Sequence, residues 1–271
     1  MCNLFPPLFM CRSFLLLCVA ALLVQPVALP CYPQNRKSTP TTLIEQPMPL
    51  KGTPEQIIQH TGYILSFNST TLCPNWVAWE LTRSEASGSG RRATDFLADP
   101  QVPLRYQVTT EEYKNSGYDR GHMCPAADMK WHPHAQTECF YMSNICPQDR
   151  KLNSGSWGTL ENACRRWAKR EGKVYIVCGP VFKRGRKKVT IGRNMAIRVP
   201  DGFFKVVLST RKGAEKAIGF YYGNHSGKQS MTQTAMSVDE VEDLTGMNFF
   251  HRIDDVLEKR VEASYNLKDW H

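Results

Sequence analysis

The residues best suited to chemistry lie between positions 118 and 161, where a histidine, two asparagines and a glutamate occur close together. His122 follows Asp119, Arg120 and Gly121. An arginine is a fixed cation that can hold a phosphate group through two hydrogen bonds. A histidine beside such a cation favours its neutral form, which can accept a proton from water. His122 is therefore the candidate general base, although a lone histidine is more often structural.

A helix is expected at 154–170, and Asn153 stands at its start with Glu161 two turns further on. The two side chains would lie roughly 12 Å apart along the helix axis, too far for both to bind one metal ion directly. One direct ligand and one carboxylate that holds a metal-bound water are easier to arrange. Oxygen ligands with several retained waters suit Mg²⁺ rather than Zn²⁺. The apolar stripe of this helix consists of Trp157, Leu160, Cys164, Trp167 and Ala168.

Asn153 also has a structural interpretation, because asparagine is a favoured helix cap. Taken alone, that interpretation is the better one, but the two roles are compatible. A neutral base, a hard cation and an arginine are together the groups needed to hydrolyse a phosphodiester bond. The base generates hydroxide, and the cation polarises the phosphoryl oxygen and neutralises the leaving oxyanion.

The elements that position these residues follow from hydrophobic pattern. A second helix is expected at 237–245, where Ser237 and Glu240 can form a capping box. The sequence predicts an α+β fold with a mainly antiparallel central sheet flanked by helices, forming a single domain over 61–271. Strands are expected at 63–67, 75–82, 173–182, 195–199, 203–209 and 217–222.

The charge balance indicates the class of partner. The chain of 271 residues has 34 Lys and Arg against 25 Asp and Glu, a net charge of +9. A positive field favours polyanions, which include nucleic acid, an anionic membrane and acidic polymers. Charge alone does not choose among them, and a basic protein without such a partner is the simplest interpretation.

The first 30 residues have the pattern of a signal peptide, with Arg12 as the only charge and an apolar run at 14–24. That run is too short to span a membrane comfortably, since a spanning helix needs about 20 residues. We therefore expect a secreted or periplasmic protein without stable membrane association after cleavage, with an uncleaved anchor as the alternative. Residues 31–60 are expected to form an N-terminal arm or linker.

Six cysteines lie beyond this region, and in an exported protein they allow about one to three disulfides, whose pairing the sequence does not determine. Cys124 and Cys146 lie near the candidate site. Each is expected either to act as a small buried apolar residue or to join a disulfide there. The six are Cys73, Cys124, Cys139, Cys146, Cys164 and Cys178.

The four residues 119–122 (DRGH) and the segments around them resemble the signature of the DNA/RNA non-specific endonucleases, which include relatives of mitochondrial endonuclease G. The resemblance covers roughly residues 63–250, with several motifs in the same order. It implies the ββα-metal, or His-Me finger, fold. The matching positions include Met123, Pro125, Ser143, Asn144, Pro147, Gln148, Asn153, Trp157, Glu161, Gly179 and Pro180.

The resemblance also implies roles for individual residues. His122 would be the general base, and Asn153 would be the only direct protein ligand of one Mg²⁺, with Mn²⁺ as a substitute. Glu161 would orient a water in the outer shell of the metal. Asn144 would position the histidine or the phosphate, and Arg120 would support the site.

An arginine from the loop before residue 96 would stabilise the pentacoordinate phosphate, and Arg92 is favoured over Arg91. The resulting hypothesis is a secreted, Mg²⁺-dependent hydrolase that cuts DNA and RNA, single- or double-stranded, and leaves 5′-phosphate ends. Its alternatives are a catalytically silent nucleic-acid-binding protein and a phosphodiesterase for extracellular nucleotides. The preference between DNA and RNA is left open, as is a homodimer.

Overall fold

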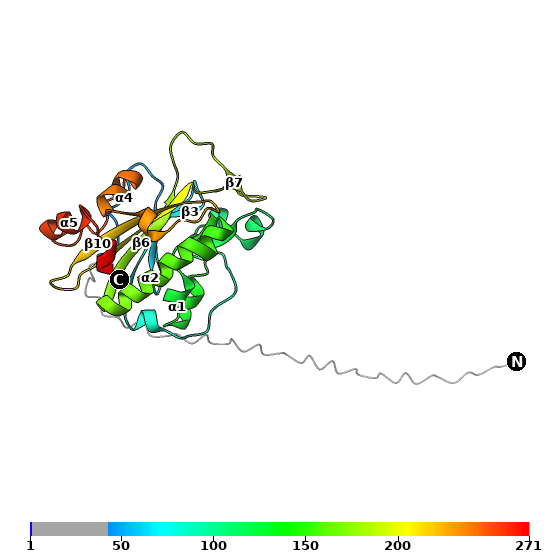
Figure 1. The fold of residues 1–271 in the computed structure, drawn as a ribbon. Coiled ribbons are helices and arrows are strands. Elements are labelled where there is room, and N and C mark those ends of the chain that lie inside the picture. Colours follow the sequence, from blue (N-terminus) through cyan, green and yellow to red (C-terminus); the bar gives the residue numbers. More distant parts are fainter. Residues whose placement is uncertain (2–42, 271) are drawn as a thin grey trace. The chain divides into compact units, whose positions relative to one another are not determined.

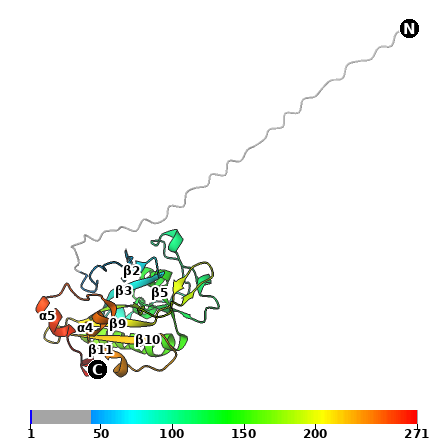
Figure 2. The ribbon, with the colours of Figure 1, turned by 90° about the horizontal axis from the view of Figure 1, so that it is seen from above.

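The computed structural model describes residue 1 and residues 43–270, which include a compact unit built on a seven-stranded antiparallel sheet (Figures 1 and 2). Most of the expected signal peptide and the first part of the expected linker lie outside the described residues. In spatial order the strands are β1 (Gln56–Gln59), β2 (Ile64–Asn68), β3 (Cys73–Thr82), β6 (Lys173–Val181), β9 (Gly202–Ser209), β10 (Lys216–Gly223) and β11 (Ala235–Met236).

The central strands are buried on both faces of the sheet. Successive side chains of a strand point to opposite faces, so Val77 and Trp79 of β3 join one core while Ala78 between them joins the other. Strand β3 pairs with β6 from Val77 opposite Cys178 to Thr82 opposite Lys173. Burial on both faces explains the nearly continuous apolar run of β6.

Helices cover both faces of the sheet. The long helix α2 (Gly158–Glu171) packs on β6 and β3, whereas α4 (Val238–Thr245) and α5 (Asp255–Glu262) pack on β10. Figure 1 shows α2 on the opposite side of the sheet from α4 and α5. The predicted α+β architecture, with a mainly antiparallel sheet between helices, is confirmed. The shorter helices are α1 (Pro133–Glu138) and α3 (Met231–Thr234).

Two small two-stranded sheets lie outside the main sheet. One pairs β4 (Asp119–His122) with β5 (Ile145–Gln148), and the other pairs β7 (Thr190–Ile191) with β8 (Ile197–Arg198). The residues 119–122 (DRGH) thus form a strand, and β4, β5 and α2 follow one another along the chain as a ββα unit. The sequence pattern did not predict β4 and β5, because strands of four residues are too short to show a period.

Some local predictions agree closely with the structure, and one boundary differs. The capping box at the start of α4 is present: the Ser237 hydroxyl accepts from the Glu240 amide at 3.1 Å, and the Glu240 carboxylate accepts from the Ser237 amide at 2.7 Å. The sheet begins before the expected domain start at residue 61, because β1 lies in the expected linker and pairs with β2. Of the four residues of β1 only Ile58 is buried, which explains its weak signal.

The expectation of disulfides is wrong for the six cysteines beyond the N-terminal region, all of which are free and buried. Several thiols donate instead to backbone carbonyls, as Cys178 Sγ does to Met123 O at 3.2 Å and Cys139 Sγ to Gln136 O at 3.1 Å. Burial raises the pKa of Cys124 well above its usual value. These residues act as small apolar side chains spread over several elements.

Within residues 43–270, the structure contains no helix long and apolar enough to cross a membrane.

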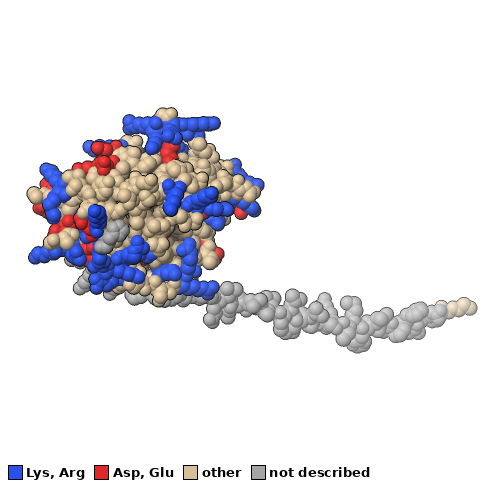
Figure 3. Space-filling view, viewed as in Figure 1, with Lys and Arg blue, Asp and Glu red and all other residues tan. Residues whose placement is uncertain are grey.

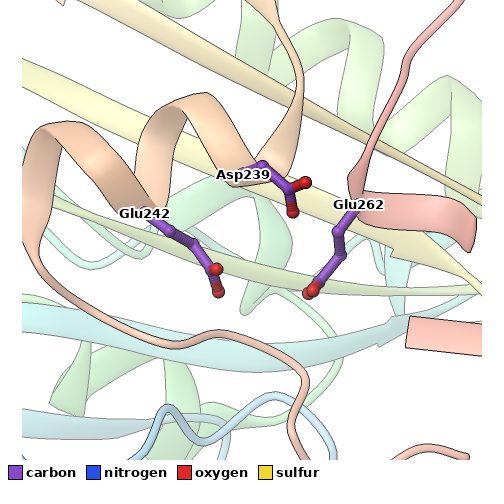
Figure 4. A group of neighbouring side chains, drawn as sticks. All are labelled: Asp239, Glu242 and Glu262. Carbon is purple, nitrogen blue, oxygen red and sulfur yellow. The ribbon is translucent and has the colours of Figure 1, made fainter. Parts of the chain in front are cut away.

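Three carboxylates face one another between α4 and α5 (Figure 4). Oxygen atoms of Asp239, Glu242 and Glu262 all lie within 4.8 Å of one another. Burial, followed by repulsion from Glu242, raises the pKa of Glu262 to about 9, and burial raises that of Glu242 to about 7. Glu262 is 4% exposed and ends α5, where the helix dipole also disfavours a negative charge. At neutral pH Glu262 therefore keeps its proton in the folded protein.

We expect Glu262→Gln to stabilise the protein at mildly alkaline pH. Between its unfolded pKa of about 4.3 and its folded pKa of about 9, Glu262 binds a proton only in the folded state. Its contribution therefore makes stability fall as the pH rises through this window. Glutamine removes that dependence, so the variant should gain more stability at about pH 8 than at about pH 5. Each kcal/mol of added unfolding free energy should raise Tm by about 2–4 °C.

Thermal unfolding at both pH values measures this effect, with Asp95→Asn on an exposed loop as the control. An equal Tm shift at the two pH values would contradict the assignment.

Candidate active site

One cavity of about 620 Å³ brings together most of the residues selected from the sequence. Side chains from β4, from the helix that follows β5 and from the loop before residue 96 line it. Among the lining residues are Arg92, Arg120, His122, Asn153 and Glu161. Of the predicted site residues only Asn144 is absent from its wall.

The pairing of β4 with β5 holds His122 in place. Gly121 lies opposite Cys146, and His122 lies opposite Ile145. A Cβ atom on Gly121 would come within 2.2 Å of Gln148 Oε1 and 2.6 Å of Gln148 Cβ. Gln148 is fully buried, so its side chain has little room to move away. Glycine is therefore required at position 121 for the two strands to approach.

His122 is held between aromatic rings and is neutral. Its ring centroid lies 5.2 Å from that of Phe96 and 4.8 Å from that of Phe140. Burial, reinforced by the charges of Arg92 and Arg120, lowers the pKa of His122 to about 3. Nε2 is buried without a hydrogen-bond partner among the described residues, which leaves Nδ1 to accept a proton from the cavity.

Asp119 orients the amide of Asn153. Asn153 Nδ2 donates to Asp119 Oδ2 at 3.2 Å, and Asp119 Oδ1 accepts from Arg150 Nε at 3.1 Å. With its nitrogen bound to Asp119, the amide leaves Oδ1 as the atom that can act as a ligand. The orientation follows from this bonding pattern. Asp119 thus links the strand that carries His122 to the helix that carries Asn153.

The helix begins earlier than predicted, and Asn153 is not its cap. Asp149 Oδ1 accepts from the amides of Lys151 at 2.9 Å and Leu152 at 3.1 Å, which is the bonding of an N-cap. Asn153 follows in the π-helical segment η6 (Leu152–Trp157), which continues into α2. A π-helical turn is rare and often marks a functional site.

Glu161 of α2 reaches the same cavity as Asn153. Its carboxylate is partly exposed and accepts no hydrogen bond from any described residue. Burial raises the pKa of Glu161 to about 7, an effect opposed by the charge of Lys205 and reinforced by that of Asp128. The free carboxylate is therefore available to hold a cation or a water bound to one.

Two arginines stack on the aromatic residues that enclose His122. Arg120 Cζ lies 4.5 Å from the centroid of the Phe96 ring, and Arg92 Cζ lies 5.1 Å from that of Phe140. Arg92 lines the cavity, whereas its neighbour Arg91 does not. Both guanidinium groups keep their hydrogen-bond donors available to an anionic ligand.

Asn144 lies behind the site and contacts neither His122 nor the cavity through a hydrogen bond. Its fully buried amide accepts from Cys124 N at 2.9 Å and donates to Cys124 O at 2.9 Å and Cys139 O at 2.8 Å. These bonds fix the chain just after His122. The sequence also missed Lys114, Tyr113 and Arg150 in the cavity wall. The available signal for Arg150 was its place three residues before Asn153.

The donor atoms in the cavity fit a hard divalent cation. Asn153 Oδ1 and the Glu161 carboxylate are oxygen donors without competing hydrogen bonds, and no thiol lines the wall. Oxygen donors with room for water suit Mg²⁺ or Mn²⁺. The residues present therefore fit the metal expected from the sequence.

Comparison with known proteins decides the family. A model of the DNA/RNA non-specific endonucleases matches residues 40–256. The chain belongs to this family. The mitochondrial nuclease EXOG of Xenopus laevis is 33% identical over 255 residues, covering 88% of this chain and 69% of the relative.

Two further similarities support the assignment. Nuclease C1 of Cunninghamella echinulata var. echinulata is 32% identical, covering 75% of this chain and 86% of the relative. A crystal structure of an EndoG/EndoGI complex matches with a TM-score of 0.68 at 28% identity, covering 75% of this chain and 89% of that one. The ββα-metal fold is thereby confirmed. The chain spans 59–69% of the EXOG relatives from Xenopus laevis, mouse and human.

The expectation of a secreted or periplasmic protein is contradicted by these comparisons. The relatives from Xenopus laevis and Schizosaccharomyces pombe are named as mitochondrial nucleases, the latter 35% identical over 170 residues, 59% of this chain and 52% of the relative. The expectation rested on an apolar run at 14–24, which lies outside the described residues. An apolar run of this kind shows only that the segment is hydrophobic and does not determine the compartment to which a protein is delivered.

We expect Gly121→Ala to destabilise the protein by about 1–3 kcal/mol, because its methyl group would collide with the buried side chain of Gln148. Gly121→Ala combined with Gln148→Ala should recover part of that loss, since the shorter side chain makes room. Urea unfolding of the single and double variants measures the coupling. Gly155→Ala is the control, because nothing lies within 4 Å of its new methyl group. Additive losses at positions 121 and 148 would contradict the collision.

Proposed function

We propose that this protein is a metal-dependent endonuclease that hydrolyses phosphodiester bonds in DNA and RNA. The observation that carries the proposal is the neutral imidazole of His122 in one cavity with Arg92, Arg120 and two free oxygen donors. Each component has a counterpart in phosphodiester hydrolysis: a base, cations for the phosphate and ligands for a divalent metal.

The proposed metal ligands are Asn153, which binds directly through Oδ1, and Glu161, which holds a metal-bound water. When bound, Mg²⁺ supplies Lewis-acid polarisation of the phosphoryl oxygen and neutralises the leaving oxyanion. Mn²⁺ has the same preference for oxygen and can substitute. Asp119 keeps the ligand atom in place by accepting from the other end of the Asn153 amide.

The proposed base is His122, whose Nδ1 takes a proton from the attacking water. The water oxygen forms a bond to phosphorus as the bond to the 3′ oxygen breaks. The 3′ oxygen then takes up a proton from solvent, which leaves a 5′-phosphate and a 3′-hydroxyl. Arg92 and Arg120 bind the phosphate oxygens, where negative charge develops in the transition state. Asn144 acts at a distance in this scheme, by fixing the backbone after His122.

A polymeric substrate is supported by the charges beside the cavity. A second groove of about 480 Å³ runs along α2 and shares Ala127 with the first cavity. Lys130, Arg166 and Lys169 are among its lining residues. Figure 3 shows Lys and Arg gathered over the lower part of this face. Contacts to a phosphate backbone need read neither the 2′-hydroxyl nor the bases, which is compatible with the proposed action on both DNA and RNA.

We expect supercoiled plasmid and RNA to be cut with Mg²⁺ and to remain intact with a chelator. His122→Ala should lower the rate by about 10²–10⁴-fold, because no other group replaces the base. Asn153→Ala should require more Mg²⁺ for the same rate. Gel assays with ligation of the products test both the rates and the 5′-phosphate ends.

Nicking that survives chelation and the His122→Ala substitution would overturn the mechanism. Binding of DNA without any cleavage by the wild-type protein would favour the silent binding protein. Cleavage confined to nucleotides would favour the small-molecule phosphodiesterase. Full activity of Asn153→Ala at limiting Mg²⁺ would contradict the assignment of Asn153 as a metal ligand and would leave the role of His122 as the base unaffected.

The affinity for Mg²⁺ should rise with pH through the ionisation of Glu161. The pKa of Glu161 is raised to about 7, so the carboxylate gains charge as the pH rises from about 6 to about 8. His122, with a pKa of about 3, stays neutral across this range and adds no pH dependence. Calorimetric titration should show a gain of about tenfold in the wild type. In Glu161→Gln the affinity should be lower and independent of pH, and an unchanged slope would contradict the role of Glu161.

A further inference from the structure

Lys205 is a charged side chain in the middle of the core. It lies on β9, opposite Cys178 of β6 and Phe220 of β10, and it is 0% exposed. Its Nζ atom has no hydrogen-bond partner among the described residues. An ammonium group buried without hydrogen bonds is costly. Its presence therefore calls for a compensating interaction.

Two tryptophan rings enclose this ammonium. Nζ lies 4.5 Å from the centroid of the Trp157 ring and 5.2 Å from that of Trp79. Such cation–π contacts stabilise a desolvated cation, but less than burial destabilises it. The tryptophans alone therefore do not explain a lysine at this position.

Ionisable neighbours of the ammonium, thiols first and then carboxylates, oppose the effect of burial. Burial lowers the pKa of Lys205, but the combined influence of Cys178, Cys164, Glu161 and Asp128 outweighs it, and the pKa is raised. Lys205 is likewise the strongest charge that lowers the pKa of Glu161. The charges of Lys205, Glu161 and Asp128 thus influence one another, with Glu161 in the cavity wall and the other two in the core.

Lys205 also contacts the elements that carry the proposed metal ligands. Trp157 is the last residue of η6, the segment that contains Asn153. Trp79 Nε1 donates to Asp128 Oδ2 at 3.2 Å, and Arg165 of α2 donates to Asp128 Oδ1 at 2.7 Å. The same cluster therefore joins β9, β3 and the helix on which Glu161 lies.

We infer that Lys205 is a positioning residue of the metal site, whose buried ammonium lies against Trp157 and Trp79 and thereby holds η6 and α2 so that Asn153 and Glu161 line one cavity. This inference rests on the proposed function of that cavity. An apolar side chain would fill the same space without the cost of a buried charge. The stability of the core therefore does not account for the lysine.

The test replaces Lys205 with methionine, which is similar in length and uncharged. We expect Lys205→Met to fold, to resist urea at least as well as the wild type, and to bind Mg²⁺ about tenfold or more weakly in calorimetry. Cleavage should lose kcat with little change in KM for nucleic acid. Lys173→Met, at the start of β6 and partly exposed, is the control and should keep the wild-type affinity for Mg²⁺.

A double-mutant cycle identifies the partner. If Lys205 acts through Glu161, adding Lys205→Met to Glu161→Gln should cause a much smaller further loss of Mg²⁺ affinity than in the wild type. Wild-type Mg²⁺ affinity in Lys205→Met would overturn the inference. Loss of the fold would also overturn it, because it requires a core that is stable without the charge. Mg²⁺ binding is measured without nucleic acid. Absence of nuclease activity in the wild type would therefore contradict the proposed function, whereas unchanged Mg²⁺ binding in Lys205→Met would contradict the role of Lys205.

Discussion

The arrangement of the site depends on the hydrogen bond between Asp119 and Asn153. Asp119 begins the strand that ends in His122, and Asn153 lies in the helix that follows the partner strand. One bond of 3.2 Å therefore sets the base relative to the proposed ligand. It also occupies the amide nitrogen and leaves the carbonyl oxygen without a hydrogen bond. The fold supports this bond through the buried contact of Gly121 with Gln148, which allows the two strands to pair.

Burial shifts the pKa values of His122 and Glu161 in opposite directions. It favours the uncharged form of both, which suits a base such as His122 but weakens a carboxylate that must attract a cation. Arg92 and Arg120 reinforce the neutral state of His122. The charge of Glu161 is supported from the core by Lys205. The partly buried cavity thus contains a neutral base and a carboxylate whose pKa, about 7, lies close to neutral pH.

Prediction from the sequence succeeded where the signal was local or periodic. The capping box of Ser237 and Glu240, the apolar run of β6 and the amphipathic pattern of α2 all depend on neighbouring residues. It failed for Asn153 as a cap, because Asp149 takes that role and a π-helical turn follows. Asn144 was expected to touch the histidine or the phosphate, but its partners are backbone groups distant in the sequence. The cysteines gave no local sign of being free.

The sequence by itself determined the family, the general base candidate and the oxygen character of the proposed metal site, because these depend on residue types in a fixed order. The tertiary structure alone decided which of the selected residues share a cavity. It placed Arg92, and not Arg91, in the cavity wall, and it placed Asn144 in the core. It also placed Lys205, which the sequence shows only as one more charge in a strand, in the core between Trp79 and Trp157. Burial and partner identity are properties of packing between distant segments, and no local pattern encodes them.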